Sequence, residues 1–111
     1  MKVYISGPMT SIEGGNRTAF GVAAKKLFLA GHESVNPVNV GRRLEYKLKR
    51  KPTWEEYMRA DIKALMDCDG ILMLENWLQS DGAKLEFQLS EELGMERITL
   101  ERNDNGNEKS L

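Results

Sequence analysis

Two carboxylates fall on otherwise apolar faces of predicted helices, where an acidic side chain is a candidate for chemistry. Glu86 lies one turn into residues 80–93, a segment whose apolar residues have helical spacing. At about 100° per residue, Glu86 lies beside Leu93 on the face that Leu85 and Leu89 also occupy. A carboxylate among core positions costs stability unless it is paired or functional. We therefore interpret Glu86 as a candidate catalytic residue; the alternative is a boundary glutamate paired with a neighbouring Lys or Arg.

Asp61 is a second carboxylate of this kind. A capping box at residues 53–56, directly after Pro52, predicts that a helix starts there. The buried stripe of this helix is predicted to comprise Trp54, Met58, Ile62, Leu65 and Met66. Asp61 falls inside the same arc. Two such carboxylates, on helices that flank one predicted strand, indicate a functional site. The alternative is that each has a cationic partner and a structural role.

The start of the Glu86 helix is a candidate anion site. Ser80 and Asp81 are both good N-cap residues, and Gly82 would let a ligand approach the first turn closely. A helix start offers unpaired N–H groups and the positive end of the helix dipole. This stretch is therefore suited to binding a phosphate or another anion.

Four short segments that have the character of strands alternate with predicted helices. The strands are residues 2–6, 32–36, 71–74 and 97–100. The first helix is predicted to follow Asn16 or Thr18, with a buried face of Phe20, Ala23, Ala24, Leu27 and Phe28. This alternation predicts a parallel sheet with right-handed crossovers and helices on both faces. The predicted fold class is α/β, a three-layer, Rossmann- or flavodoxin-like sheet of about four to five strands.

The carboxyl ends of the predicted strands carry most of the residues that could bind a ligand. Ligands of such sheets bind beyond these ends, at the point where the strand order switches. This edge carries Ser6-Gly7-Pro8, Asn36-Pro37 and the loop of residues 75–82, and the Glu86 helix starts from it. We therefore expect the candidate site residues to gather there.

Two further segments allow more than one interpretation. Residues 9–15 include Thr10, Ser11 and a Gly14-Gly15 pair, which could wrap a polar ligand. They match neither a P-loop nor a dinucleotide fingerprint, so a plain βα connection is favoured. Residues 42–51 are strongly basic, and the prediction for such a run is a solvated loop or short helix. The alternatives are a flap that attracts anionic substrates and a nucleic-acid patch.

The composition describes one ordinary domain and excludes several classes of site. The 111 residues carry a net charge of −1, so there is no global electrostatic case for binding nucleic acid or a membrane, and neither is expected as a partner. With one Cys and one His, no internal disulfide, zinc cluster or other cofactor is expected. No apolar run spans a membrane and no leader precedes the first strand, so a cytoplasmic protein is expected. Residues 1–101 are predicted to form one domain and residues 102–111 a polar, flexible tail.

The order and spacing of these motifs resemble the nucleoside 2-deoxyribosyltransferase superfamily, in particular its small phage and bacterial members. The matching features are Val3-Tyr4-Ile5-Ser6-Gly7-Pro8-Met9-Thr10, residues 31–37, 54–61 and 69–74, Ser80-x-Gly82-x-x-x-Glu86, and Gly94. Together they span most of residues 1–100. In that superfamily the glutamate matching Glu86 is the nucleophile, and the aspartate matching Asp61 assists at the sugar and base.

The resemblance implies cleavage of the N-glycosidic bond of a 2′-deoxynucleoside or its 5′-monophosphate. Glu86 would attack the anomeric carbon and form a covalent deoxyribosyl-enzyme. Asp61, with a pKa raised by apolar neighbours, would protonate or position the leaving base. The substrate-binding residues expected at this edge are Tyr4, Ser6, Gly7, Pro8, Met9, Asn36, Trp77, Ser80, Asp81 and Gly82. Relatives often complete the pocket with a neighbouring subunit, so a homo-oligomer, a dimer or higher, is expected.

Ser80 bears on the choice of substrate within this resemblance. In the transferases the matching position tends to be an acid that holds the 5′-hydroxyl. In the related 2′-deoxynucleoside 5′-monophosphate N-hydrolases it is a serine that contacts the 5′-phosphate. Ser80 therefore favours a 5′-monophosphate substrate and water as the acceptor. The alternatives are a base-exchanging deoxyribosyltransferase and a non-catalytic module that senses or sequesters a nucleotide.

Overall fold

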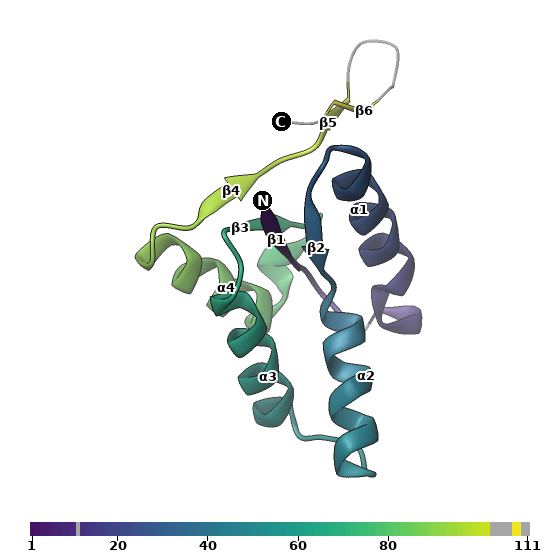
Figure 1. The fold of residues 1–111 in the computed structure, drawn as a ribbon. Helices are drawn as coiled ribbons and strands as arrows, with labels where there is room; N and C mark the ends of the chain where they lie inside the picture. The colour runs from purple at the N-terminus through teal and green to yellow at the C-terminus, as the bar shows by residue number, and fades with distance from the viewer. Residues whose placement is uncertain (11, 103–107, 110–111) are drawn as a thin grey trace.

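A parallel sheet of four strands lies at the centre of the molecule (Figure 1). The computed structural model describes residues 1–10, 12–102 and 108–109. Within them the elements follow in the order β1 (Lys2–Ser6), η1 (Glu13–Asn16), α1 (Arg17–Leu29), β2 (Glu33–Val35), α2 (Pro37–Leu48), α3 (Trp54–Met66), β3 (Gly70–Met73), η2 (Trp77–Gln79), α4 (Asp81–Glu92), β4 (Glu96–Ile98), β5 (Glu101–Arg102) and β6 (Glu108–Lys109). The strands of the sheet begin and end within two residues of their predicted bounds.

The sheet has the strand order β2-β1-β3-β4, and every neighbouring pair is parallel. Tyr4 of β1 is in register with Val35 of β2 on one side and Ile71 of β3 on the other. Four helices pack around this sheet, so the predicted α/β fold class with helices on both faces is confirmed. The order switches between β1 and β3, because the chain leaves β1 on one side and returns on the other.

Alternate residues of β1 face opposite layers of the molecule. Val3 and Ile5 belong to the core that packs under α1. Tyr4 packs in the opposite layer with Leu65 of α3, and Leu89 of α4 completes that layer. Ser6 shares the face of Tyr4, since side chains two residues apart in a strand point the same way. The central strand therefore presents two hydroxyl groups to the layer formed by α3 and α4.

The buried face of α4 differs from the predicted one. Leu85 and Leu93 are 36% and 57% exposed, whereas Ala83, Glu86 and Ser90 are buried. Small residues let the helix approach its neighbours closely, and Glu86 finds polar partners on the sheet. A count of apolar residues along the helix cannot show either effect.

The buried stripes of α3 and α1 are narrower than predicted. In α3 the buried residues are Met58, Asp61 and Leu65, one helical turn apart, while Trp54 and Met66 are partly exposed. In α1, Phe28 is largely exposed, and the buried residues are Phe20, Ala23 and Leu27. The prediction for Asp61 is confirmed in its burial.

Of the two forms predicted for residues 42–51, a loop or a short helix, the structure shows a helix as far as Leu48. Asn36 caps α2 by accepting a hydrogen bond from the N–H of Val38 at 3.0 Å, and Pro37 occupies the first turn, where it needs no hydrogen-bond partner. The helix ends at Leu48, and its C-cap residue Lys49 has a left-handed φ of 56°. In Figure 1, α2 and α3 project from the carboxyl edge of the sheet as a helical hairpin. We call residues 37–66 the α2–α3 arm.

The end of the chain is described only in part. β5 pairs antiparallel with β6, apart from the main sheet. Residues 103–107 and 110–111, on which most of the predicted flexible tail falls, lie outside the described residues. Across the part of the chain that is described, no helix has the length and apolar character to cross a membrane.

Candidate active site

A cavity of about 740 Å³ lies beyond the carboxyl ends of the strands, as predicted for this kind of sheet. It is lined by the segment that follows β1, by one side of each arm helix and by the start of α4. Asp61 and Glu86 both line it, although they lie on different helices. The structure therefore brings the two carboxylates singled out by the sequence into one cavity.

Glu86 is held by two hydroxyl groups of β1. The side chain is 4% exposed. The Tyr4 hydroxyl donates to Oε2 at 2.8 Å and the Ser6 hydroxyl donates to Oε1 at 2.6 Å. Burial raises the pKa of Glu86 to about 6, and the two hydrogen bonds oppose that rise because they stabilise the ionised form. At neutral pH Glu86 is therefore an ionised carboxylate in a fixed orientation.

Asp61 is buried without such support. It is 8% exposed, and within the described residues its carboxyl group has no hydrogen-bond or ion-pair partner. Burial, and then the nearby charge of Glu86, raise the pKa of Asp61 to about 8. At neutral pH Asp61 is therefore mainly a neutral acid that can donate a proton.

The pair thus combines one ionised and one protonated carboxyl group between about pH 6 and about pH 8. The difference has a physical cause, because hydroxyl donors stabilise the charge on Glu86 and nothing comparable is placed at Asp61. Within the described residues neither Glu86 nor Asp61 forms an ion pair with a Lys or Arg, so the alternative of two paired carboxylates does not hold. A nucleophile or base beside an acid is an arrangement that suits group transfer.

Tyr4 is a neutral donor at every physiological pH. Its burial, followed by the charges of Glu86 and Asp61, raises its pKa well above the usual value of a tyrosine. Its hydroxyl therefore keeps the proton that it donates to Glu86. The same residue also packs in the core beside Ile71, so its position is fixed by the sheet.

The start of α4 forms one wall of the cavity. Ser80 is the N-cap, and its oxygen accepts the N–H of Ala83 at 3.1 Å, which leaves the hydroxyl hydrogen free to donate to a ligand. A Cβ atom added at Gly82 would lie 2.9 Å from Sδ of Met58. The glycine therefore makes room for the Met58 side chain of α3, and not only for the approach of a ligand. Asp81 is exposed at the rim and pairs with Lys84 at 3.4 Å.

The segment after β1 supplies the opposite wall. A Cβ atom at Gly7 would lie 2.7 Å from Cβ of Leu74, so the glycine permits Leu74, just after β3, to lie close against this segment. Gly14 and Gly15 have φ of 66° and 65° and line the cavity. Asn16 does not cap α1 with its side chain as predicted; its amide donates to the carbonyl of Pro8 at 3.0 Å and fixes the loop.

Several predicted substrate-binding residues do not line the cavity. Trp77 packs against Phe87, with ring centroids 4.6 Å apart, beneath the guanidinium of Arg97. Asn36 acts as a helix cap beside the cavity-lining Pro37. Pro8 lines a separate hollow beside α1. Ser6 is fully buried, and it contributes to the site by holding Glu86 with a hydrogen bond. The predicted residues that line the cavity are Tyr4, Gly7, Met9, Asp61, Ser80, Asp81, Gly82 and Glu86.

Other cavity residues were not predicted as a site. Arg17, Arg42 and Lys51 place three cationic side chains around it. Arg42 and Lys51 lie in the basic run, which offered a signal, but nothing in the sequence distinguished Arg17. Tyr57 donates to Glu45 at 2.6 Å across the two arm helices, and both residues line the cavity. Among the residues described, no three His, Cys, Asp or Glu side chains are grouped to hold a metal ion.

A family model described as a domain of unknown function (DUF4406) matches residues 1–99. The chain belongs to this family. The match covers every strand of the main sheet and every residue that lines the cavity. A comparison with curated proteins found no match.

The raised pKa of Asp61 predicts a pH-dependent cost to stability. Between about pH 4 and about pH 8 the unfolded chain has lost this proton while the folded chain retains it, so the free energy of unfolding falls as pH rises. Asp61→Asn removes the buried ionisable group. We expect urea unfolding to show the variant more stable than the wild type by roughly 2–5 kcal/mol at pH 9, with little difference at pH 4.

Glu91→Gln is the control for that measurement, because Glu91 is an exposed residue of α4. The difference between Glu91→Gln and the wild type should be equally small at pH 4 and at pH 9. A wild-type stability that tracks Asp61→Asn from pH 4 to pH 9 would contradict the burial argument.

Proposed function

We propose that the protein cleaves the N-glycosidic bond of a 2′-deoxynucleoside 5′-monophosphate or deoxynucleoside, with Glu86 as nucleophile and Asp61 as general acid. The observation that carries this proposal is the pair of buried carboxyl groups on one cavity, ionised at Glu86 and protonated at Asp61. The resemblance to the 2-deoxyribosyltransferase superfamily supports it independently, because the matching residues have these roles there.

The proposed reaction has two displacements at the anomeric carbon. In the first, an oxygen of Glu86 bonds to C1′, the bond from C1′ to the base nitrogen breaks, and the proton of Asp61 passes to the leaving base. In the second, water attacks C1′, its proton passes to Asp61, and the bond to Glu86 breaks. Tyr4 and Ser6 position the carboxylate throughout, and the anomeric configuration is retained. A second base in place of water would give the transferase reaction.

The cationic groups in the cavity lining, which also includes Glu45 and Asp81, support an anionic substrate. Arg17, Arg42 and Lys51 line the cavity, and the free hydroxyl hydrogen of Ser80 lies at a helix start. Such groups stabilise a phosphate through charge and hydrogen bonding. The aromatic and apolar residues of the arm that line the same cavity offer a surface for a base: Trp54, Tyr57, Met58 and Val38. This supports a 5′-monophosphate over a nucleoside.

The first test is Glu86→Gln with chromatographic detection of free base from each deoxynucleoside and 5′-monophosphate. Gln keeps the size of the side chain and can hydrogen-bond to the two hydroxyl groups, but it is not a nucleophile. We expect release of base to fall by about 10³-fold or more. Circular dichroism should show an unchanged fold.

Lys84→Gln is the matched control, because it changes a charge on the same helix without touching the carboxylate pair, and it should keep base release. Full activity of Glu86→Gln would overturn the mechanism. If the wild type releases no base with or without an acceptor base, yet nucleotides raise its melting temperature, the alternative of a non-catalytic binding module is correct.

The pKa values predict a bell-shaped pH profile for base release. The acid limb lies near pH 6, where Glu86 ionises, and the alkaline limb lies near pH 8, where Asp61 loses its proton. Tyr4→Phe removes a hydrogen bond that favours the ionised Glu86, so the acid limb should move to higher pH. A profile whose acid limb is unchanged in Tyr4→Phe would remove Glu86 from that assignment.

Asp61→Asn tests the general acid separately. It should abolish the alkaline limb and slow the release of neutral bases. An N7-methylated purine leaves without needing a proton, so its release should be nearly unaffected by the substitution. Equal loss of rate for both kinds of substrate would show that Asp61 does not donate the proton.

We also propose that the protein is a cytoplasmic homo-oligomer, as the resemblance implies. The support in the structure is the exposure of large apolar side chains at the two ends of α4, where Leu78 and Leu93 are more than half exposed. Sedimentation velocity of the purified chain should return a mass above that of the 12.6 kDa monomer. A monomer at micromolar concentration would contradict this proposal and leave the chemistry untouched.

A further inference from the structure

The near-neutral total charge hides a strong local separation of charge. Residues 42–51 contain six of the 16 Lys and Arg residues but only one of the 17 Asp and Glu residues. The remainder of the chain is therefore clearly acidic. The structure places this basic segment on the outer half of α2 and the turn that follows it, where every one of these cationic residues is exposed. The net charge of −1 gives no reason to expect binding of nucleic acid or a membrane, but this surface is locally basic.

Three of the six cationic groups lie on one face of α2, and the other three follow the helix. At about 100° per residue, Arg42, Arg43, Tyr46 and Lys47 span the side opposite Gly41 and Leu44. That opposite side is the packed one: Gly41 is buried, and a Cβ atom there would lie 3.4 Å from the ring of Tyr57 in α3. We call Arg42, Arg43, Tyr46, Lys47, Lys49 and Lys51 the basic face of the arm.

The cations of the basic face lack anionic partners. In the part of the chain that the structure describes, Arg42, Arg43, Lys47, Lys49 and Lys51 form no ion pair. Arg50 differs, because it forms a bidentate pair with Glu56 at 2.8 Å that fastens the turn to α3. Like charges four residues apart, such as Arg43 and Lys47, destabilise a helix by about 0.2–0.5 kcal/mol. An external polyanion would relieve this repulsion.

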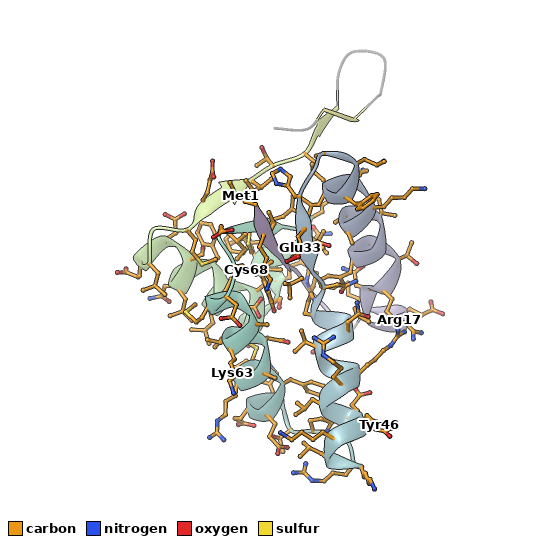
Figure 2. The ribbon with its side chains drawn as sticks, viewed as in Figure 1. Met1, Arg17, Glu33, Tyr46, Lys63 and Cys68 are labelled. Atoms are coloured by element: carbon orange, nitrogen blue, oxygen red, sulfur yellow. The ribbon has the colours of Figure 1, made fainter. Side chains whose placement is uncertain are left out.

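Tyr46 stands among these charges as an exposed aromatic ring. Its side chain is 83% exposed and lies on the outer side of α2, away from the sheet (Figure 2). It is one turn from both Arg42 and Arg43. Cationic side chains that follow a phosphate backbone, with an aromatic ring on which a base stacks, are the combination that binds single-stranded nucleic acid.

We propose that the basic face of the arm binds single-stranded nucleic acid, with the cationic groups on the phosphates and Tyr46 stacked on a base. An anionic membrane fits less well, because Val38 and Val40 of α2 are buried and Tyr46 is its one exposed large apolar side chain, which is too little to enter a bilayer. A duplex fits less well, since its bases are already stacked and do not offer a face to Tyr46.

Arg42 and Lys51 also line the cavity, so the bound strand passes its mouth. This goes beyond the proposed glycosidase activity and does not depend on it.

The experiment is fluorescence anisotropy of a labelled 20-nucleotide oligo-dT with the full chain, measured over a range of salt concentrations. The wild type should bind, and its affinity should fall steeply with salt. Arg43→Gln/Lys47→Gln removes two phosphate contacts outside the cavity, and the slope of log affinity against log salt should become shallower by about 1.4. Tyr46→Ala should weaken binding about tenfold, and Tyr46→Phe should restore it because Phe still stacks.

The charge-matched control is Lys25→Gln/Lys63→Gln, two exposed lysines of α1 and α3 that lie outside the basic face. Lys63 lies on the far side of α3 from α2 (Figure 2). This control should bind oligo-dT as the wild type does. Three outcomes would each overturn the proposal: no oligo-dT binding, equal weakening by the control, or binding to phosphatidylserine vesicles in place of oligo-dT. Equal affinity for a 20-base-pair duplex, with no effect of Tyr46→Ala, would overturn the assignment to single strands.

Discussion

The buried carboxylate of Glu86 is the constraint on which the rest of the site depends. An ionised side chain in a largely apolar layer needs compensation, and here it comes from two hydroxyl donors rather than from a cation. A Lys or Arg partner would lower the pKa further but would also neutralise the charge that a nucleophile uses. Hydroxyl donors hold the group in place and leave its charge available. Their position follows from the two-residue period of β1.

The remaining geometry can be understood from that contact. β1 lies between β2 and β3, so Tyr4 and Ser6 emerge at the switch in strand order, where the segments after β1 and β3 separate. α4 must lie close to β1 for Glu86 to reach them, and small residues on α4 permit this. α3 must in turn approach α4, which the absence of a Cβ at Gly82 allows. Asp61 is thereby brought within the electrostatic influence of Glu86 without sharing its hydroxyl donors.

The sequence predicted the parts of this arrangement that depend on local patterns. The four strands, the α/β class and the burial of Asp61 and Glu86 follow from periodicity and from turn residues. The orientation of α4 did not follow, because Leu85 and Leu93 outweigh Ala83 and Ser90 in any count of hydrophobicity. Long-range contacts were equally hidden: nothing local to Tyr4 and Ser6 indicates that they meet a residue some 80 positions later. The sequence did not decide between a loop and the helix α2, because the charged residues are typical of a loop and the start of the helix is marked only by Asn36-Pro37.

The outer part of the α2–α3 arm projects from the sheet (Figure 1), and this bears on how such proteins diversify. Its helices are held to each other by Tyr57 against Gly41 and Glu45, and by Arg50 against Glu56. None of these contacts involves β1 or Glu86. Changes in the length, charge or aromatic content of the outer half of α2 and the turn after it can therefore alter what enters the cavity, while Glu86, its hydroxyl donors and Asp61 stay fixed. Mutations there would offer new ligands to an unchanged reactive centre, so chemistry and specificity can evolve at separate rates.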